Sequence, residues 1–208
     1  MKLYYSPGAC SVGIHVVLEE IGKPYELSPV ALKDGAQYKP EYMAINPKSK
    51  VPALQRDDGS VLTEWPVIAA YLARTNPEAK LMPTDLEGEI RCMEMLDYVC
   101  GTIHPQGFTR QFRATNFTSR EEDLPKVIEQ GKQLAAKYFD TLEKGWTHTG
   151  TWVLPSGYSV ADAALFFVEY WAARRSGMSL PPHLDAHLKA MLARPAVQRT
   201  LQQEGLPA

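Results

Sequence analysis

Hydrophobic residues follow two different periods along the chain, and the change between them falls near residue 77. Before that point, short apolar stretches predict strands, and two longer segments with apolar residues on one face predict helices. Asp58-Gly59 is a typical hairpin turn, and Pro66 stands in a first helical turn, where proline is tolerated. The expected order is βαβ followed by ββα, with strands at 2–6, 24–31, 51–57 and 60–64 and helices at 10–22 and 65–75.

After residue 87 the pattern is helical throughout. Four segments repeat apolar residues with a period near 3.6 and often end at Gly or Pro. The proline-containing, polar stretch before them is typical of a linker. The sequence therefore predicts an α+β protein of two domains, a small α/β domain at 1–77, a linker at 78–86 and an all-helical domain at 87–208, with helices at 89–104, 123–145, 159–175 and 183–205.

Composition narrows the class of partner. The 208 residues are 45% hydrophobic and 22% charged, with a formal net charge of -2. Binding to nucleic acid or to an anionic membrane needs a basic surface, so we expect a small molecule or a protein as partner instead. Three cysteines without a CxxC pair argue against a disulfide framework and against a metal site. With no membrane span or signal peptide in the pattern, we expect a cytoplasmic protein.

Cys10 stands where a Pro-Gly turn meets the first predicted helix. If that helix starts near Ser11, the thiol lies at the helix cap, where unpaired N–H groups and the positive end of the dipole stabilise an anion. Such a position lowers a cysteine pKa and activates the thiol. The alternative is a small buried hydrophobic residue, the common role of a free cysteine. No second cysteine is close enough in sequence for dithiol chemistry.

The other two cysteines and the histidines are expected in the core, at the surface or, in one case, at a pocket. Cys92 and Cys100 lie among apolar residues and are expected in the core, as is His15. Without the spacing of metal ligands, three further histidines are expected at the surface: His148, His183 and His187. His104 shares one face of a long helix with Asp97, Gly101 and Phe108. The adjacent Pro105 should kink this helix, so His104 is either a pocket residue or an ordinary half-exposed one.

Four stretches together resemble the glutathione transferases, in particular the bacterial beta class, which has a cysteine at the glutathione site. They are "MKLYYSPGACS" at 1–11, "INPKSKVPAL" at 45–54, "LTE" at 62–64 and "GYSVADAALF" at 157–166. The resemblance covers nearly the whole chain and implies a thioredoxin-like first domain. It also implies glutathione as co-substrate, no metal cofactor, and a homodimer with the helix at about 87–113 in its interface.

The resemblance also implies a glutathione site. Val51-Pro52 is similar to the family's cis-proline step, with the Val51 backbone pairing with the cysteinyl unit of glutathione and Ala9 beside it. Glu64 and the helix start at Trp65 are similar to the clamp for the γ-glutamyl end. Two lysines are candidates for the glycyl carboxylate, and either could instead be a solvated surface charge: Lys33 and Lys50. The family usually has a small residue after the glutamate, so the Trp65 indole is expected to narrow the pocket or to form its wall.

Two chemistries are possible at a site that contains Cys10 and His104. In both, His104 is expected to polarise or deprotonate one of the two thiols, that of Cys10 or that of glutathione. Glutathione thiolate attacks a small hydrophobic electrophile, or Cys10 exchanges mixed disulfides with glutathione. Aromatic residues of the helical domain are candidates for the electrophile pocket or for its core: Phe108, Phe112, Phe117 and Trp171. Two other interpretations stay open, a non-catalytic binding protein on the same scaffold and a glutathione-dependent isomerase or dehalogenase.

In "GYSVADAALF", Ser159 and Asp162 predict a capping box that starts a buried helix.

Overall fold

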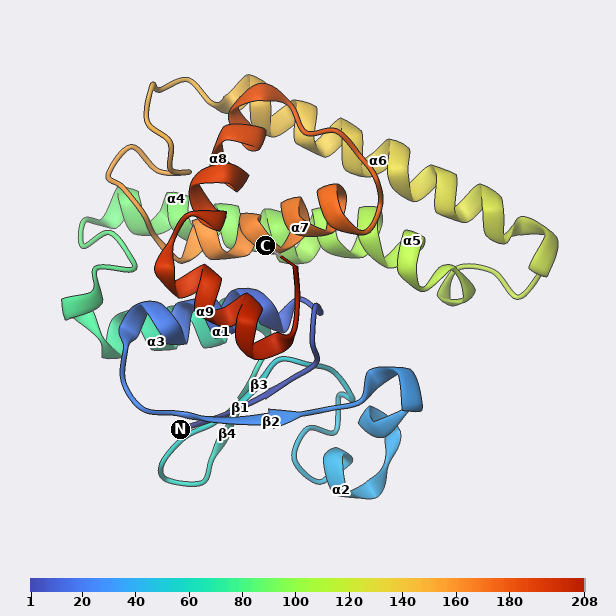
Figure 1. Cartoon of the computed structure of the whole chain (residues 1–208), viewed down its shortest axis with the longest axis horizontal. Helices are drawn as coiled ribbons and strands as arrows, with labels where there is room; N and C mark the ends of the chain where they lie inside the picture. The colour runs from blue at the N-terminus through green and yellow to red at the C-terminus, as the bar shows by residue number, and fades with distance from the viewer. Residues whose placement is uncertain (208) are drawn as a thin grey trace. The chain divides into compact units, whose positions relative to one another are not determined.

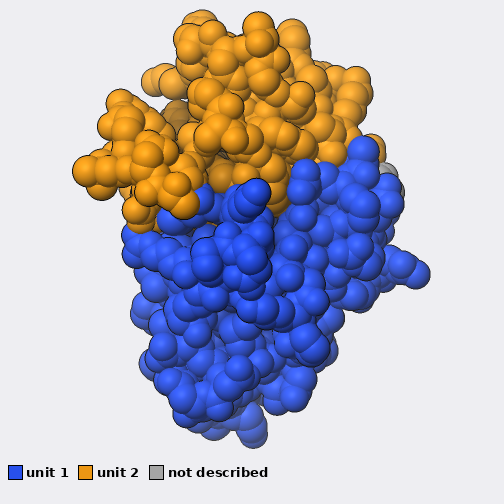
Figure 2. Space-filling view, turned by 90° about the vertical axis from the view of Figure 1, so that its left-hand side faces the viewer, with its two compact units in different colours: residues 1–82, 192–208 blue, residues 83–191 orange. Residues whose placement is uncertain are grey.

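The computed structural model describes residues 1–207, which form two compact units (Figure 2). The first comprises Met1–Met82 and the C-terminal segment from Leu192 on, and the second comprises Pro83–Met191. The predicted fold class, an α/β domain and a helical domain, is confirmed. The boundary differs in one respect, because the segment from Leu192 on belongs to the first unit instead of the helical one. In residues 1–207, no helix is both long and apolar enough to cross a membrane.

The first unit is built on a four-stranded mixed sheet. Its strands are β1 (Lys2–Tyr5), β2 (Glu26–Pro29), β3 (Ala53–Gln55) and β4 (Val61–Thr63), in the order β2-β1-β3-β4. β1 runs parallel to β2 and antiparallel to β3, and β3 pairs antiparallel with β4. The parallel pair needs a crossover, which the first helix supplies, and the antiparallel pair needs only the predicted hairpin. Gly59 in that hairpin has a φ of 83°, which glycine adopts without strain.

Three helices lie together on one side of this sheet, α1 (Ser11–Ile21), α3 (Trp65–Thr75) and α9 (Pro195–Glu204) (Figure 1). The apolar residues that predicted α1 and α3 are buried there, among them Ile14 and Ile68, which have no exposed surface. The connection from β2 to β3 carries a short helix, α2 (Pro40–Met43), and two 3-10 turns, η1 (Leu32–Asp34) and η2 (Ala36–Tyr38); a third, η3 (Pro77–Ala79), follows α3.

The second unit contains helices and turns from α4 to α8. They are α4 (Leu86–Asp97), the π-helical η4 (Tyr98–Phe108), α5 (Thr109–Phe112), the 3-10 turns η5 (Ala114–Asn116) and η6 (Glu121–Asp123), α6 (Leu124–Gly145), α7 (Val160–Arg174) and α8 (Pro182–Leu192). Every residue of α7 from Val160 to Ala172 is buried, and α7 packs against α4 and η4. A helix that is buried on all sides lies at the centre of a helical bundle and not at its periphery.

Two prolines change the predicted helices. The expected segment at 183–205 is two helices, α8 and α9, because Pro195 requires an extended residue before it, and Arg194 has a ψ of 132°. Pro105 does not produce a simple kink. It lies inside η4, where the backbone widens to π-helical turns and the helix then continues into α5. The wider turn removes the clash of the proline ring with the carbonyl one turn earlier.

Asp162 organises the start of α7. The predicted capping box is present, because the Ser159 hydroxyl accepts a hydrogen bond from the Ala161 N–H and the Asp162 carboxylate accepts one from the Ser159 N–H at 2.7 Å. The same carboxylate also accepts from the Val153 N–H at 2.8 Å. One buried side chain therefore ties the preceding loop to the first turn of the central helix.

His187 corrects an expectation, because it is fully buried and not at the surface. Its ring nitrogens lie 2.7 Å from a Glu169 oxygen and 3.1 Å from an Asp162 oxygen. Burial alone would lower the pKa of His187, but the charges of Glu169 and Asp162 outweigh it and raise this pKa to about 10. A histidine held between two buried acidic side chains has no periodic signal in sequence, which is why the spacing of the histidines gave no indication of it.

We expect Asp162→Ala to lower the free energy of unfolding by about 3 kcal/mol, because it leaves the half-buried Val153 N–H and the buried Ser159 N–H without this acceptor and removes one of the two acidic partners of the His187 ring. Thermal and urea unfolding of the full chain measure the loss. Asp140→Ala, at an exposed position of α6, is the matched control and should change the stability by less than about 0.5 kcal/mol. A loss below about 1 kcal/mol for Asp162→Ala would contradict this role.

Candidate functional site

Cys10 caps the first helix, as predicted, and lies at the carboxyl end of β1. α1 begins at Ser11, and the Cys10 side chain is partly exposed. Its Sγ donates a hydrogen bond to the Val51 carbonyl at 3.4 Å. The Ser11 hydroxyl, which could have faced the thiol, instead binds the Ser6 backbone at 3.1 Å. The thiol is therefore held by the loop before β3 and not by neighbouring hydroxyls of its own turn.

The protonation of Cys10 differs from the expectation. Burial raises the pKa of its thiol to about 12, although its own N–H, the Ser11 N–H and the positive charge of Lys50 all act to lower it. The helix terminus does favour the anion, but desolvation is the larger effect. In the structure the thiol acts as a hydrogen-bond donor to the Val51 carbonyl.

The loop that faces Cys10 contains the cis peptide bond between Val51 and Pro52, as the resemblance implied. The Lys50 carbonyl just before it accepts hydrogen bonds from the Tyr42 hydroxyl at 2.6 Å and from the Asn46 side chain at 2.8 Å. Tyr42 and Asn46 are buried, so they fix this loop from the inside. Neither residue was a candidate in the sequence, because both act on a backbone atom that no motif marks.

Ala9 and Val51 belong to one apolar cluster beneath this loop. Val51 is part of its buried core together with Tyr4 and Tyr42, and Ala9 packs against that core. The Tyr4 and Tyr42 rings meet edge to face, 6.0 Å apart. The cluster places the Cys10 turn and the cis-proline loop side by side, although some 40 residues separate them in sequence.

Trp65 has a different position from the one expected. The indole is buried, with 5% of its surface exposed, and its Nε1 donates a hydrogen bond to the Cys10 carbonyl at 3.0 Å. The indole therefore holds the backbone of Cys10, and its effect on the glutathione pocket stays a prediction. A buried indole needs an acceptor for its N–H, and the cap residue of α1 supplies one.

Glu64 precedes α3 with a φ of 70°, a conformation that costs energy for a residue with a side chain. Its exposed carboxylate pairs with Lys48 Nζ at 2.7 Å, and Lys48 also donates to the Thr63 hydroxyl at 2.9 Å. Lys48 is a partner that the sequence did not indicate. Lys50 and Lys33 are both exposed, and of these the charge of Lys50 acts on Cys10.

A buried carboxylate from the C-terminal helix supports the Cys10 turn. Glu204 accepts a hydrogen bond from the Gly8 N–H at 2.9 Å, and its other oxygen lies 2.9 Å from His15 Nδ1. His15 is buried, as expected, and its second nitrogen lies 2.6 Å from the Gln203 side-chain oxygen. Gly8 has a φ of 69°, and a Cβ there would approach Leu206 to 3.3 Å. The turn is thus fixed by residues nearly 200 positions away.

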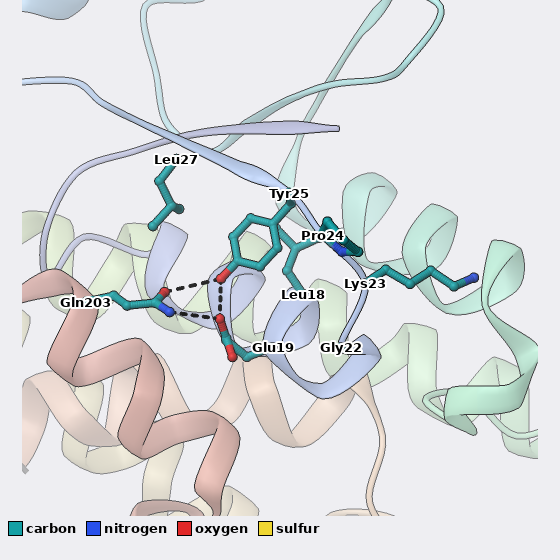
Figure 3. Close-up of a pocket in the computed structure, with 8 residues that line it drawn as sticks. All are labelled: Leu18, Glu19, Gly22, Lys23, Pro24, Tyr25, Leu27 and Gln203. Carbon is teal, nitrogen blue, oxygen red and sulfur yellow. Dashed lines mark hydrogen bonds between the residues drawn. The ribbon is translucent and has the colours of Figure 1, made fainter.

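The same contacts continue to a hollow of about 420 Å³ at the far end of α1 (Figure 3). There the Tyr25 hydroxyl and the Gln203 side-chain amide both point at the Glu19 carboxylate, with donor–acceptor distances of 2.5 and 3.1 Å. Arg199 Nε donates to the second Glu19 oxygen at 2.6 Å. These bonds connect α9 to α1 along its length, so the Cys10 turn, α1 and α9 form one hydrogen-bonded body.

In the helical unit His104 lies in an aromatic cluster. Its ring meets the Trp171 ring edge to face at 5.1 Å and the Phe167 ring at 5.6 Å. Phe112 lies 5.5 Å from Trp171 and is half-buried, whereas Phe108 has no exposed surface and packs on Phe139. Phe108 and Trp171 therefore form the base of this cluster. Phe117 is exposed and stacks under Arg110, apart from the expected wall.

The sheet order, the cis-proline loop beside a capping cysteine and the helical second unit define a class of proteins with a thioredoxin-like first domain and a helical second one. The model of the glutathione S-transferase N-terminal domain matches residues 8–75, and that of the C-terminal domain matches residues 125–190. The chain belongs to the glutathione S-transferase family.

Relatives over the full length agree with this assignment. Glutathione S-transferase GstA of Escherichia coli O157:H7 is 37% identical over 99% of this chain and 100% of its own. A bacterial beta class glutathione S-transferase of Sphingomonas chungbukensis has a TM-score of 0.86, 32% identity and full coverage of both chains. A glutathione transferase homologue from Sulfitobacter, solved with bound glutathione, has a TM-score of 0.89 and 29% identity over 99% of this chain and 98% of its own. The resemblance seen in the sequence is confirmed, as is the enzyme class.

We expect Cys10 to react slowly with iodoacetamide at pH 7.5, because a thiol with a pKa near 12 has little thiolate. Peptide mass spectrometry of the folded chain and of the urea-unfolded chain gives the two rates. The folded rate should be lower by about tenfold or more and should rise steadily with pH up to at least pH 10. A folded rate equal to or above the unfolded rate would show that the helix terminus dominates after all.

Proposed function

We propose that this glutathione transferase binds glutathione at the Cys10 turn and conjugates it to an electrophile, with Cys10 as a donor to the glutathione sulfur. The observation that carries the proposal is the hydrogen bond that the Cys10 thiol donates to the Val51 carbonyl at 3.4 Å. When a thiolate takes that position, the Cys10 S–H can turn to it and stabilise its charge. The sulfur then attacks the electrophilic carbon, a carbon–sulfur bond forms, and the leaving group departs with its electron pair.

The other contacts to glutathione would come from the cis-proline loop and from the start of α3. The Val51 backbone would pair with the cysteinyl unit, and the N-terminus of α3 with Glu64 would hold the γ-glutamyl end. The strained φ of Glu64 supports this role, because such strain collects at binding sites. Lys50, whose charge already reaches Cys10, is the better placed candidate for an anionic group, with Lys33 as the second.

His104 lies in the other unit, so its pairing with a thiol stays a prediction, as does the role of Phe112 and Trp171 toward a hydrophobic electrophile. A cytoplasmic location is likewise proposed, supported by three free cysteines, which suit a reducing compartment. The second chemistry, exchange of mixed disulfides, is favoured by the absence of a resolving cysteine but opposed by the high pKa of the thiol.

Two substitutions of Cys10 separate these chemistries. Cys10→Ser keeps a hydrogen-bond donor and should retain conjugation of glutathione to 1-chloro-2,4-dinitrobenzene within about threefold, whereas Cys10→Ala should lower kcat/KM by about tenfold. On the donor role, the wild-type chain has little exchange with 2-hydroxyethyl disulfide for either variant to lose. Cys100→Ser is the control for a general effect of removing a thiol. If Cys10→Ser abolishes conjugation as completely as Cys10→Ala, the sulfur itself is required and the donor role is wrong.

We also propose a homodimer with the segment from about 87 to 113 in its interface. Leu86 is 74% exposed and Ile90 is 49% exposed, and they lie one turn apart on one face of α4. Exposed large apolar side chains in a row are typical of a protein interface. Light scattering should give twice the chain mass of 23.2 kDa, and Ile90→Glu should shift it toward the single chain. A wild-type mass of one chain would contradict the proposal.

A further inference from the structure

The helical unit contains a large hollow that no residue of the proposed glutathione site lines. It has a volume of about 870 Å³ and lies among α4, the first residue of η4, the end of α6 and the loop that follows α6. Sites for small organic molecules have volumes of about 300 to 1,000 Å³, so this α4–α6 hollow is large enough for one. Its apolar wall comprises Met95, Tyr98, Leu142, Trp146, Val153 and Leu154.

The aromatic part of this wall is held in place before any ligand binds. Trp146 directly follows α6, and its Nε1 donates a hydrogen bond to the Gly150 carbonyl at 3.0 Å. Its indole also stacks on the His183 ring at 6.0 Å and meets the His187 ring edge to face at 5.9 Å. Because the indole is already fixed, a ligand that lies on this wall does not lose affinity in ordering it.

The charged residues of the hollow are mainly acidic. Three carboxylates line it from α4 and its cap: Asp85, Glu87 and Glu94. Within residues 1–207, Arg91 is the only lysine or arginine of the lining. Arg91 pairs with Glu87 at 2.8 Å and with Glu94 at 2.9 Å, and both pairs are exposed and therefore weak. Because one guanidinium cannot neutralise three carboxylates, the lining keeps a net negative charge.

The other polar groups of the lining do not offset this charge. α6 ends at Gly145, and the unpaired carbonyls of a helix C-terminus carry partial negative charge. The N-terminus of α4 has the opposite sign, but the Asp85 carboxylate caps it by accepting from the Gly88 N–H at 2.8 Å. His148 Nδ1 accepts a hydrogen bond from the Gly150 N–H at 3.1 Å, which an imidazolium cannot do. The hollow therefore combines an apolar wall with a negative rim.

We propose that the α4–α6 hollow is a second ligand site, which binds an organic cation made of an apolar ring system and an ammonium group. The ring system lies along the wall at Trp146, and the ammonium group meets Glu87 and Glu94. A carboxylate has about four acceptor positions, so each can bind an ammonium in addition to its present arginine partner. These carboxylates lie about a quarter turn round α4 from Leu86 and Ile90, which are proposed for the dimer interface. The site is independent of the proposed conjugation, because its lining lies wholly in the helical unit.

Three probes with one ring system test the site by equilibrium binding. Isothermal titration calorimetry of the full chain at pH 7.5 compares 2-(aminomethyl)naphthalene, 2-naphthamide and 2-naphthoate, which are a cation, a neutral molecule and an anion. We expect the cation to bind about tenfold more tightly than the amide, and the naphthoate to bind more weakly than either. Glu87→Gln and Glu94→Gln should each lower the affinity for the cation by about threefold and leave that for the amide unchanged.

Arg91→Gln should have the opposite effect and raise the affinity for the cation by about threefold, because it removes the positive charge from the lining. General damage to the fold would not improve binding. Saturating glutathione should leave the affinity for the cation unchanged, since the two sites share no residue.

Glu122→Gln is the matched control, because Glu122 is also an exposed glutamate of the helical unit, pairs with Arg120 at 3.0 Å and does not line the hollow. It should leave all three affinities unchanged. Equal affinity of wild type for the three probes, no binding of the cation, a preference for the cation that survives the double variant Glu87→Gln and Glu94→Gln, or competition between the cation and glutathione would overturn the inference.

Discussion

The buried carboxylate of Glu204 is the interaction on which the first unit depends. It accepts a hydrogen bond from the Gly8 N–H and pairs with His15, and all three groups are removed from water. A buried charge without partners is costly, so this arrangement is stable only when the C-terminal helix, α1 and the turn before Cys10 are all in place. The position of the cysteine therefore depends on the last residues of the chain as much as on the first.

The second unit uses a carboxylate in the same manner. Asp162 caps α7, binds the preceding loop through Val153 and faces the ring of His187. Local capping and long-range pairing meet in one side chain, and the helix that it starts is the buried centre of its unit. Each unit thus has a buried acidic group that joins a local turn to a distant helix and orients a nearby histidine.

The correct predictions from the sequence concern features that depend on residues close together in the chain. The strands, the bounds of α3, the capping box and the start of α1 at Ser11 follow from periodicity or cap residues, and the cis bond at Pro52 was implied by the family resemblance. The errors concern residues whose partners are distant in sequence. Neither the burial of His187 between two acids, nor the membership of α9 in the first unit, nor the Trp65 bond to the Cys10 carbonyl has a signal in neighbouring residues.

The pKa of Cys10 shows why a correct local argument gave the wrong sign. A helix terminus stabilises an anion by about 0.3 to 1 kcal/mol, up to about 2 in partly buried cases, which is roughly one pKa unit. Desolvation shifts a thiol pKa in the opposite direction, and at Cys10 it is the larger effect. The sequence shows the helix start but not the burial, so it contains the smaller effect only. The backbone N–H groups of the turn and the Lys50 charge act in the direction that the sequence indicated, and they are outweighed by desolvation of the thiol.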